Sequence, residues 1–234
     1  MNANVSERLA NLSTPHLADA CLRVGAPVRC GPAGVTAVQR GMRCAGRALP
    51  VRHVGSVDIF LEALEHAQPG DVLVVDNGGR IDEACVGDLV TLEVQKAGLH
   101  GIVIWGLHRD TDELVSIGLP VFSLGTMATG PQRLDSRPAD SMQSARFGPW
   151  NITQEDVVAC DSDGVLFMPE KQLQEIIVAA TNIRETERQQ AEKMRAGISL
   201  REQTRFAEYL SARAITPTVG FREHLRRLGR AIEE

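Results

Sequence analysis

The stretch "DVLVVDNGGRIDEACVGDLVTLEVQKAGLHGIVIWGLHRD", residues 71–110, contains two apolar runs separated by a helix-like segment. "DVLVVD" and "GIVIW" show no alternation of polar and apolar residues, which indicates strands buried on both faces. Between them, "NGGRIDEACVG" is typical of a glycine-bearing loop, and "DLVTLEVQKAG" predicts a helix that ends at Gly98. This order predicts a βαβ unit, and therefore a mainly parallel sheet flanked by helices.

The segments on either side of this unit continue the alternation of helices and strands. Residues 13–25 predict a helix with Ser13 at its cap, and residues 30–55 predict short strands and turns. The next segment, "SVDIFLEALEHAQPGD", predicts a helix. Its expected buried face carries Val57, Phe60, Leu61 and Leu64. Beyond the unit, "TDELVSIG" predicts a helix, "LPVFSLG" a strand, and "DVVACDSDGVLFMP" two strands around an Asp-Gly turn.

The C-terminal part of the chain is predicted to be helical. Residues 169–197 indicate one long helix with Pro169 near its first position. The apolar stripe of this helix is Leu173, Ile176, Ile177, Ala180 and Ile183. Beyond Ile183 the helix becomes polar, and the remaining tail is too weakly apolar for a domain of its own. We therefore expect an α/β core over residues 1–168 and a helical extension over residues 169–234 that packs on the core and on a neighbouring subunit.

The composition is that of an ordinary globular protein, with 43% apolar and 24% charged residues. The formal net charge of −5 disfavours binding to nucleic acid. The sequence lacks a signal-peptide pattern and an apolar run of membrane-spanning length, so a cytoplasmic location and no membrane contact are expected. Five widely spaced cysteines without a CxxC pair predict reduced, buried thiols and disfavour a zinc site.

Charged residues cluster at one expected edge of the sheet. In a parallel unit, the carboxyl end of each strand and the amino end of the next helix point to the same edge, where ligands usually bind. Asp76 ends the first strand, Asp88 begins the helix, and Arg109 with Asp110 follows the second strand. We expect these four residues to face one cleft.

The residue types in this cleft indicate a site for an anion and a hard cation. The first amides of the helix, at Leu89 and Val90, can hold a carboxylate or phosphate. Asp88 would repel a bare anion unless a cation lay beside it, which favours a divalent metal in the same pocket. The positively charged guanidinium of Arg109 can donate hydrogen bonds to a carboxylate or enolate oxygen. Asp110 is the expected metal ligand.

Each of these residues also has a structural interpretation. Asp110 with Glu113 forms a D-x-x-E capping box, Asp88 is a favourable acid at a helix start, and Arg109 alone is typical of a surface ion pair. The histidines lack a relay partner recognisable from the sequence and are expected at the surface or in the core, namely His53, His66, His100 and His108. The three lysines, Lys96, Lys171 and Lys193, lie on expected helix surfaces, which disfavours Schiff-base chemistry.

Asp88, the twenty residues that follow it, and Arg109-Asp110 form a D-x20-R-D pattern that resembles the RraA-like family. The enzymatic members are metal-dependent 4-hydroxy-4-methyl-2-oxoglutarate / 4-carboxy-4-hydroxy-2-oxoadipate aldolases. The resemblance extends from "HLADACLRVG" to "VVACDSDGVLFMPE" and implies a swivelling β/β/α fold with a partly parallel sheet, assembled as a homotrimer or homohexamer.

Carried onto this sequence, the resemblance implies that Asp110 binds Mg²⁺ or Mn²⁺ and that Asp88 contacts the metal's water shell. Gly87, Leu89, Val90 and Arg109 would bind the substrate. The implied activity is retro-aldol cleavage of a small 2-oxo acid to pyruvate, together with oxaloacetate decarboxylase activity.

The sequence departs from the family pattern in two places. Trp105 adds bulk near the end of the second strand, and the glutamate that the aldolases take from a neighbouring subunit has only Glu202 as a candidate. No residue is assigned as the general base. The alternative function is a non-enzymatic RraA-type regulator of RNase E; the long C-terminal extension favours the enzyme. The methyltransferase label sometimes attached to the family lacks support, because the chain has no glycine-rich cofactor loop.

Overall fold

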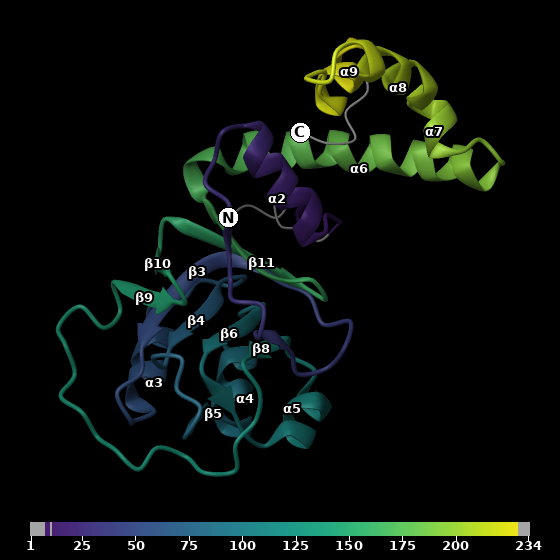
Figure 1. Cartoon of the computed structure of the whole chain (residues 1–234). Helices are drawn as coiled ribbons and strands as arrows, with labels where there is room; N and C mark the ends of the chain where they lie inside the picture. The colour runs from purple at the N-terminus through teal and green to yellow at the C-terminus, as the bar shows by residue number, and fades with distance from the viewer. Residues whose placement is uncertain (1–7, 10, 229–234) are drawn as a thin grey trace.

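The computed structural model describes residues 8, 9 and 11–228 (Figure 1). The strands are β1 (Arg29–Cys30), β2 (Thr36–Ala37), β3 (Cys44–Arg52), β4 (Val72–Asp76), β5 (Ala84–Val86), β6 (Gly101–Trp105), β7 (Leu107–His108), β8 (Val121–Ser123), β9 (Ser144–Phe147), β10 (Trp150–Thr153), β11 (Asp156–Asp161) and β12 (Gly164–Pro169). The helices are α2 (Thr14–Arg23), α3 (Asp58–Glu65), α4 (Asp88–Lys96), α5 (Thr111–Ile117), the 3-10 turn η1 (Glu170–Gln172), α6 (Leu173–Arg195), α7 (Leu200–Gln203), α8 (Phe206–Ile215) and α9 (Phe221–Arg227).

The central sheet has eight strands in the order β1-β12-β11-β3-β4-β6-β8-β2. Strands β3, β4, β6 and β8 are parallel to one another, whereas β11, β12, β1 and β2 pair antiparallel. The expected βαβ unit is therefore present as β4, α4 and β6. All five residues of β4 are buried, as the unbroken apolar run predicts.

The helices cover one face of the curled sheet at two places. Helices α3, α4 and α5 pack on one face through a cluster that includes Phe60, Val94 and Leu114. Helices α2 and α6 pack on the same face farther along the curled sheet, over β11 and β12, through a cluster that includes Leu17 and Ile177 (Figure 1). The opposite face is covered by strands β9 and β10, through a cluster that includes Phe147 and Phe167. Each fully buried side chain of this kind stabilises the fold by about 2 kcal/mol relative to an exposed one.

The predicted buried face of α3 is partly wrong. Ile59, Phe60 and Ala63 are buried, but Val57 is 53% exposed and Leu61 is 48% exposed. The helix begins at Asp58. Residues 59 and 63 are four apart, so they lie on one face of the helix, and this face, together with Phe60, packs toward the sheet. Val57 and Leu61 consequently line a cavity beside the start of α4.

The predicted helix start at residue 13 and the predicted hairpin at residues 156–169 are confirmed. The Ser13 side chain caps α2, and the His16 side chain completes a capping box. The position predicted for Pro169 is wrong: it is the last residue of β12, and α6 starts at Leu173 after η1.

Helix α6 is the base of a C-terminal helical arm. Its predicted stripe is buried and faces α2, and its second half extends beyond the sheet (Figure 1). Helices α7, α8 and α9 follow at the far end, where the rings of Phe206, Tyr209 and Phe221 pack together. In the described part of the chain, neither α6 nor any other helix combines the length and apolarity needed to cross a membrane.

All five cysteines are free thiols. Four are buried, as expected, but Cys30 is exposed because it lies on the short edge strand β1.

Candidate functional site

The residues around the start of α4 meet those that follow β7. Strands β5 and β7 pair in parallel, and the Arg109 amide donates to the Val86 carbonyl at 2.9 Å. Asp88 and Asp110 therefore emerge side by side. The Asp88 amide donates to Asp110 Oδ2 at 3.3 Å, and Arg109 Nε lies 3.4 Å from the same oxygen. The meeting point is formed by these two short strands and not by the ends of β4 and β6.

Gly87 permits this approach. A Cβ at this position would lie 2.2 Å from Asp110 Oδ2 and 3.2 Å from Arg109 Nε. The backbone at Gly87 is extended, with φ −133°, which any residue adopts. The requirement for glycine is therefore steric: only a residue without a side chain lets the Asp110 carboxylate reach the helix terminus.

Asp110 has a left-handed backbone, with φ 58° and ψ 45°. Asp tolerates this conformation better than most residues, but it still costs free energy, and such strain concentrates at functional sites. The Asp110 side chain makes no capping hydrogen bond to α5. The capping-box interpretation with Glu113 is therefore wrong, because the carboxylate points toward α4 instead.

A cavity of about 310 Å³ opens at this point. It is lined by His53, Gly55, Val57, Leu61, Ala84, Cys85, Gly87, Asp88, Leu89, Val90, Glu93, Arg109 and Pro131. The volume suits a small organic molecule. The Leu89 amide donates to Asp88 Oδ1 at 2.7 Å, so a substrate carboxylate at the helix start would compete with the Asp88 side chain for this donor.

The donor set fits a hydrated Mg²⁺ better than a cage of protein ligands. Among the described residues, no group of three or more His, Cys, Asp or Glu side chains is arranged to hold a metal. Two carboxylates, Asp88 and Asp110, lie at the helix start. Mg²⁺ commonly binds through one or two carboxylates and keeps several waters, whereas a structural zinc site needs four protein ligands.

Two acids predicted to lie at or near the site, Asp76 and Glu202, are outside the cavity lining. Asp76 accepts from the Gly78 amide at 2.9 Å and from the Arg146 amide at 3.0 Å, so its carboxylate holds a loop and β9. Glu202 caps α7 by accepting from the Ser199 amide at 2.8 Å, and these bonds lower its pKa. Helix α7 lies at the far end of α6 from α4 (Figure 1). Within one chain, Glu202 does not approach the site.

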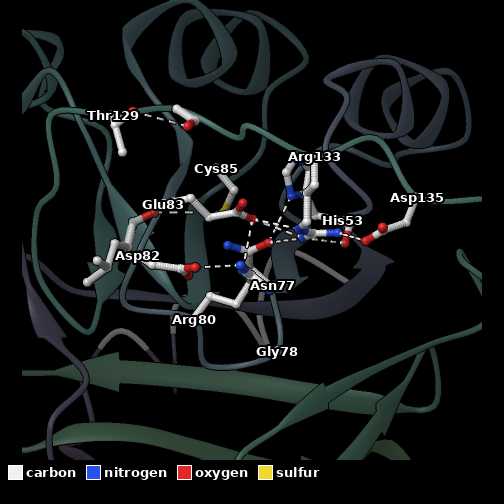
Figure 2. A network of polar contacts seen from close by, with 12 residues as sticks. His53, Asn77, Gly78, Arg80, Asp82, Glu83, Cys85, Thr129, Arg133 and Asp135 are labelled. Atoms are coloured by element: carbon white, nitrogen blue, oxygen red, sulfur yellow. Dashed lines mark hydrogen bonds and ion pairs between the residues drawn. The ribbon is translucent and has the colours of Figure 1, made fainter.

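A buried polar network behind the cavity was not predicted from the sequence. Arg133 Nε donates to Glu83 Oε1 at 3.1 Å, and Arg133 Nη2 donates to Asn77 Oδ1 at 3.0 Å (Figure 2). His53 Nδ1 lies 2.9 Å from the same Asn77 oxygen. A guanidinium can only donate, so Asn77 must present its oxygen, and His53 must carry its proton on Nδ1. His53 lies 24 residues from Asn77 in the sequence, and Arg133 lies 56 residues from Asn77. No local sequence pattern therefore predicts the network.

This network fixes the state of the His53 ring. Burial lowers the pKa of His53, which therefore remains neutral near pH 7. Its Nε2 is buried and has no hydrogen-bond partner among the described residues. The ring stacks on Phe60 of α3 with the centroids 5.3 Å apart, and it forms part of the cavity wall. The sequence did not reveal that Asn77 is the hydrogen-bond partner of His53.

The segment 124–143, here called the strap, connects β8 to β9 and closes one side of the cavity with Pro131. Its backbone lies tight against Gly55, where a Cβ would be 2.1 Å from the Arg133 carbonyl oxygen. A Cβ at Gly130 would lie 3.0 Å from Arg109 Nη1. The strap therefore passes close to the Arg109 guanidinium and forms part of the cavity wall.

The lysines occupy helix surfaces, as expected. Lys96, Lys171 and Lys193 are all exposed, and none of them lines the cavity.

Comparison with known proteins gives consistent similarities. The Aldolase/RraA family, described as RraA-like, matches residues 14–167. Protein DlpA of Legionella pneumophila is 27% identical over 206 residues, which cover 85% of this chain and 33% of DlpA, so the chain spans about a third of that relative's length. A Pseudomonas aeruginosa protein named "Putative 4-hydroxy-4-methyl-2-oxoglutarate aldolase" is 32% identical over 126 residues, which cover 53% of this chain and 76% of that protein.

A solved structure shows the same fold. Streptomyces coelicolor RraAS2, described as an unusual member of the RNase ES inhibitor RraA protein family, matches with a TM-score of 0.70 and 27% identity, covering 80% of this chain and 96% of RraAS2. The fold class expected from the sequence, α/β with a partly parallel sheet and a helical C-terminal arm, is confirmed.

Proposed function

This chain belongs to the Aldolase/RraA family, and from that premise we propose that it is a divalent-metal-dependent carbon–carbon lyase that cleaves a small 2-oxo acid to pyruvate. The observation that supports this function best is the contact of Asp110 and Arg109 with the glycine at the start of α4, beside a cavity of small-molecule size. The similarity to a protein named as an aldolase supports the same reaction class.

The chain supplies three kinds of contact for this reaction. Asp110 would hold Mg²⁺ or Mn²⁺, and Asp88 would contact the water shell of the metal. Arg109 is half exposed and donates toward the keto oxygen, where negative charge develops during cleavage. The first amides of α4, at Leu89 and Val90, orient the substrate carboxylate with help from the helix dipole. When bound, the metal supplies a Lewis acid that stabilises the same charge.

The retro-aldol step breaks the bond between C3 and C4 of a 4-hydroxy-2-oxo acid. The electron pair of this bond moves to C3 and forms the pyruvate enolate. The 4-hydroxyl loses its proton and becomes the carbonyl of the second product, and C3 then takes a proton to give pyruvate. Decarboxylation of oxaloacetate breaks the corresponding bond, releases CO₂ and gives the same enolate, so one site serves both reactions.

The test is pyruvate release from oxaloacetate and from 4-hydroxy-4-methyl-2-oxoglutarate with Mg²⁺, with Mn²⁺ and with EDTA. Turnover is expected with either metal and should disappear with the chelator. Absence of metal-dependent pyruvate release from every 2-oxo acid tested refutes the proposal.

The similarity to RraAS2 favours one alternative, a regulator that binds an RNase E-type enzyme. An inhibition assay with purified RNase E tests it. For a lyase we expect unchanged RNA cleavage.

We also propose a homotrimer or homohexamer in which the helical arm reaches a neighbouring subunit, since a single chain leaves Glu202 remote from the site. Light scattering measures the mass, and a monomer at micromolar concentration contradicts this assembly.

A further inference from the structure

The wall of the cavity carries an unusual balance of charge for a site that takes an organic acid. Among its lining residues in the described part of the chain, Arg109 is the only arginine or lysine. Two acidic side chains, those of Asp88 and Glu93, line the cavity. The Asp110 carboxylate lies at the edge of the cavity, against Gly87. In the proposed function, Arg109 binds the keto oxygen of the substrate and is not available to a second carboxylate.

Other basic residues near the cavity are already paired with acids. Arg133 of the strap donates to the buried carboxylate of Glu83 and to Asp135. Arg137 of the strap contacts Glu62 of α3 at 2.6 Å and Asp58 at 3.6 Å. Moving either guanidinium toward a substrate would leave a carboxylate without its partner.

The part of the wall away from Arg109 is mostly apolar. Val57 and Leu61 of α3 face it, although both are about half exposed, and Ala84, Cys85 and Pro131 complete this side. His53 is the remaining polar ring there; its Nδ1 proton is bonded to Asn77, and burial lowers its pKa, so the ring is neutral. A second carboxylate on the substrate would lose water here without gaining a positive partner from this chain.

We propose that this site prefers 4-hydroxy-2-oxo acids whose C4 substituent is uncharged and apolar, so that its best substrates are monocarboxylic rather than dicarboxylic acids. This inference rests on the proposed lyase function and specifies its substrate class. The reaction is the same retro-aldol cleavage: the bond between C3 and C4 breaks, C3 becomes the methyl carbon of pyruvate, and C4 leaves as an aldehyde or ketone with an apolar substituent.

A matched pair of substrates tests this preference. 4-Hydroxy-2-oxopentanoate and 4-hydroxy-2-oxoglutarate differ at C5, which is a methyl group in the first and a carboxylate in the second. With Mg²⁺, kcat/KM for pyruvate release should be at least about tenfold higher for the pentanoate. Equal values, or a preference for the glutarate, overturn the inference and leave the lyase function standing. Pyruvate release from neither compound overturns the inference; the lyase function falls as well only if oxaloacetate and 4-hydroxy-4-methyl-2-oxoglutarate also give no pyruvate.

Variants separate the effect of the wall from the intrinsic reactivity of the two compounds. Leu61→Lys adds a cation to the apolar side and should lower the pentanoate-to-glutarate ratio about fivefold, the size expected for a partly exposed ion pair. Leu22→Lys places the same change on α2, at a residue that is 58% exposed and outside the cavity lining, and should leave the ratio unchanged. Val57→Lys is a second variant on the same side. If neither cavity variant changes the ratio, the proposed cause of the preference is wrong.

Discussion

Replacement of Gly87 by alanine tests the central contact of the site. Gly87 is the N-cap of α4, and its extended backbone accepts alanine without strain. The added Cβ, however, would lie 2.2 Å from Asp110 Oδ2. Ordinary contact requires the carboxylate to move away by about 1 Å, because atoms of this size repel strongly at the shorter distance.

The movement should affect catalysis far more than stability. A misplacement of about 1 Å in a catalytic group costs about 100-fold in rate. The fold loses the hydrogen bond from the Asp88 amide to Asp110, which is long at 3.3 Å and contributes about 1 kcal/mol. Alanine also reduces the entropy of the unfolded chain, which offsets roughly half of this loss. We expect a melting temperature within about 3 °C of the native protein.

The assay compares kcat/KM for pyruvate release with thermal unfolding in the same samples. Gly220→Ala is the matched control: Gly220 is the N-cap of α9 and has a negative φ of −84°, and a Cβ added there would meet no atom within 4 Å. The control should keep full activity. Native activity in Gly87→Ala would show that the position of Asp110 at the start of α4 is irrelevant to turnover, and the proposed site would be wrong.

Three further predictions address the charge, the network and the pH dependence. Asp110→Asn keeps the size and the tolerance for a left-handed backbone but removes the charge, so kcat/KM should fall at least about 100-fold with little change in melting temperature; a fall of less than tenfold argues against metal binding there. Glu83→Gln leaves Arg133 without its buried counter-ion and should reduce the unfolding free energy by about 3 kcal/mol, which is about 9 °C in melting temperature by calorimetry; an unchanged value contradicts a stabilising role. Burial lowers the pKa of His53 below its ordinary value of 6.5, so the unfolded state binds more protons below that pH, and the stability present above pH 6.5 is lost as pH falls. His53→Gln should reduce the proton uptake on unfolding between pH 5 and 6.5 by up to about one, measured from denaturant titrations, and an unaltered slope would mean that His53 does not titrate differently in the two states.

Much of the core fold follows from patterns that act locally. The unbroken apolar runs of β4 and β6 require burial on both faces, and the cap at Ser13 and the turn before Gly164 define their elements through nearby backbone groups. The face of α3 was predicted incorrectly at Val57 and Leu61, because a helix of eight residues is too short for periodicity to distinguish the sheet side from a cavity side.

The candidate site was predictable only in part. The sequence indicates that Asp88, Arg109 and Asp110 lie at one edge, since a βαβ unit returns the chain to the point where its helix begins. It does not indicate that Asp110 has a left-handed backbone or that Gly87 touches its carboxylate. The His53 network depends on pairs far apart in the chain, and such contacts carry no signal in a single sequence.

The spacing between Asp88 and Arg109-Asp110 has a geometric cause. Helix α4 has nine residues and carries the chain about 13 Å away from Asp88. The five residues of β6 carry it back about 16 Å, and β7 aligns the last step beside β5. The outward and return paths match closely, so a fixed number of intervening residues brings Asp110 to the amide of Asp88. An insertion within α4 would rotate its face by about 100° per residue and separate the apolar residues on the sheet side from their partners. The spacing is therefore required by packing as well as by chemistry, and it is informative about function only because the residues at its two ends are ionic and partly exposed instead of apolar.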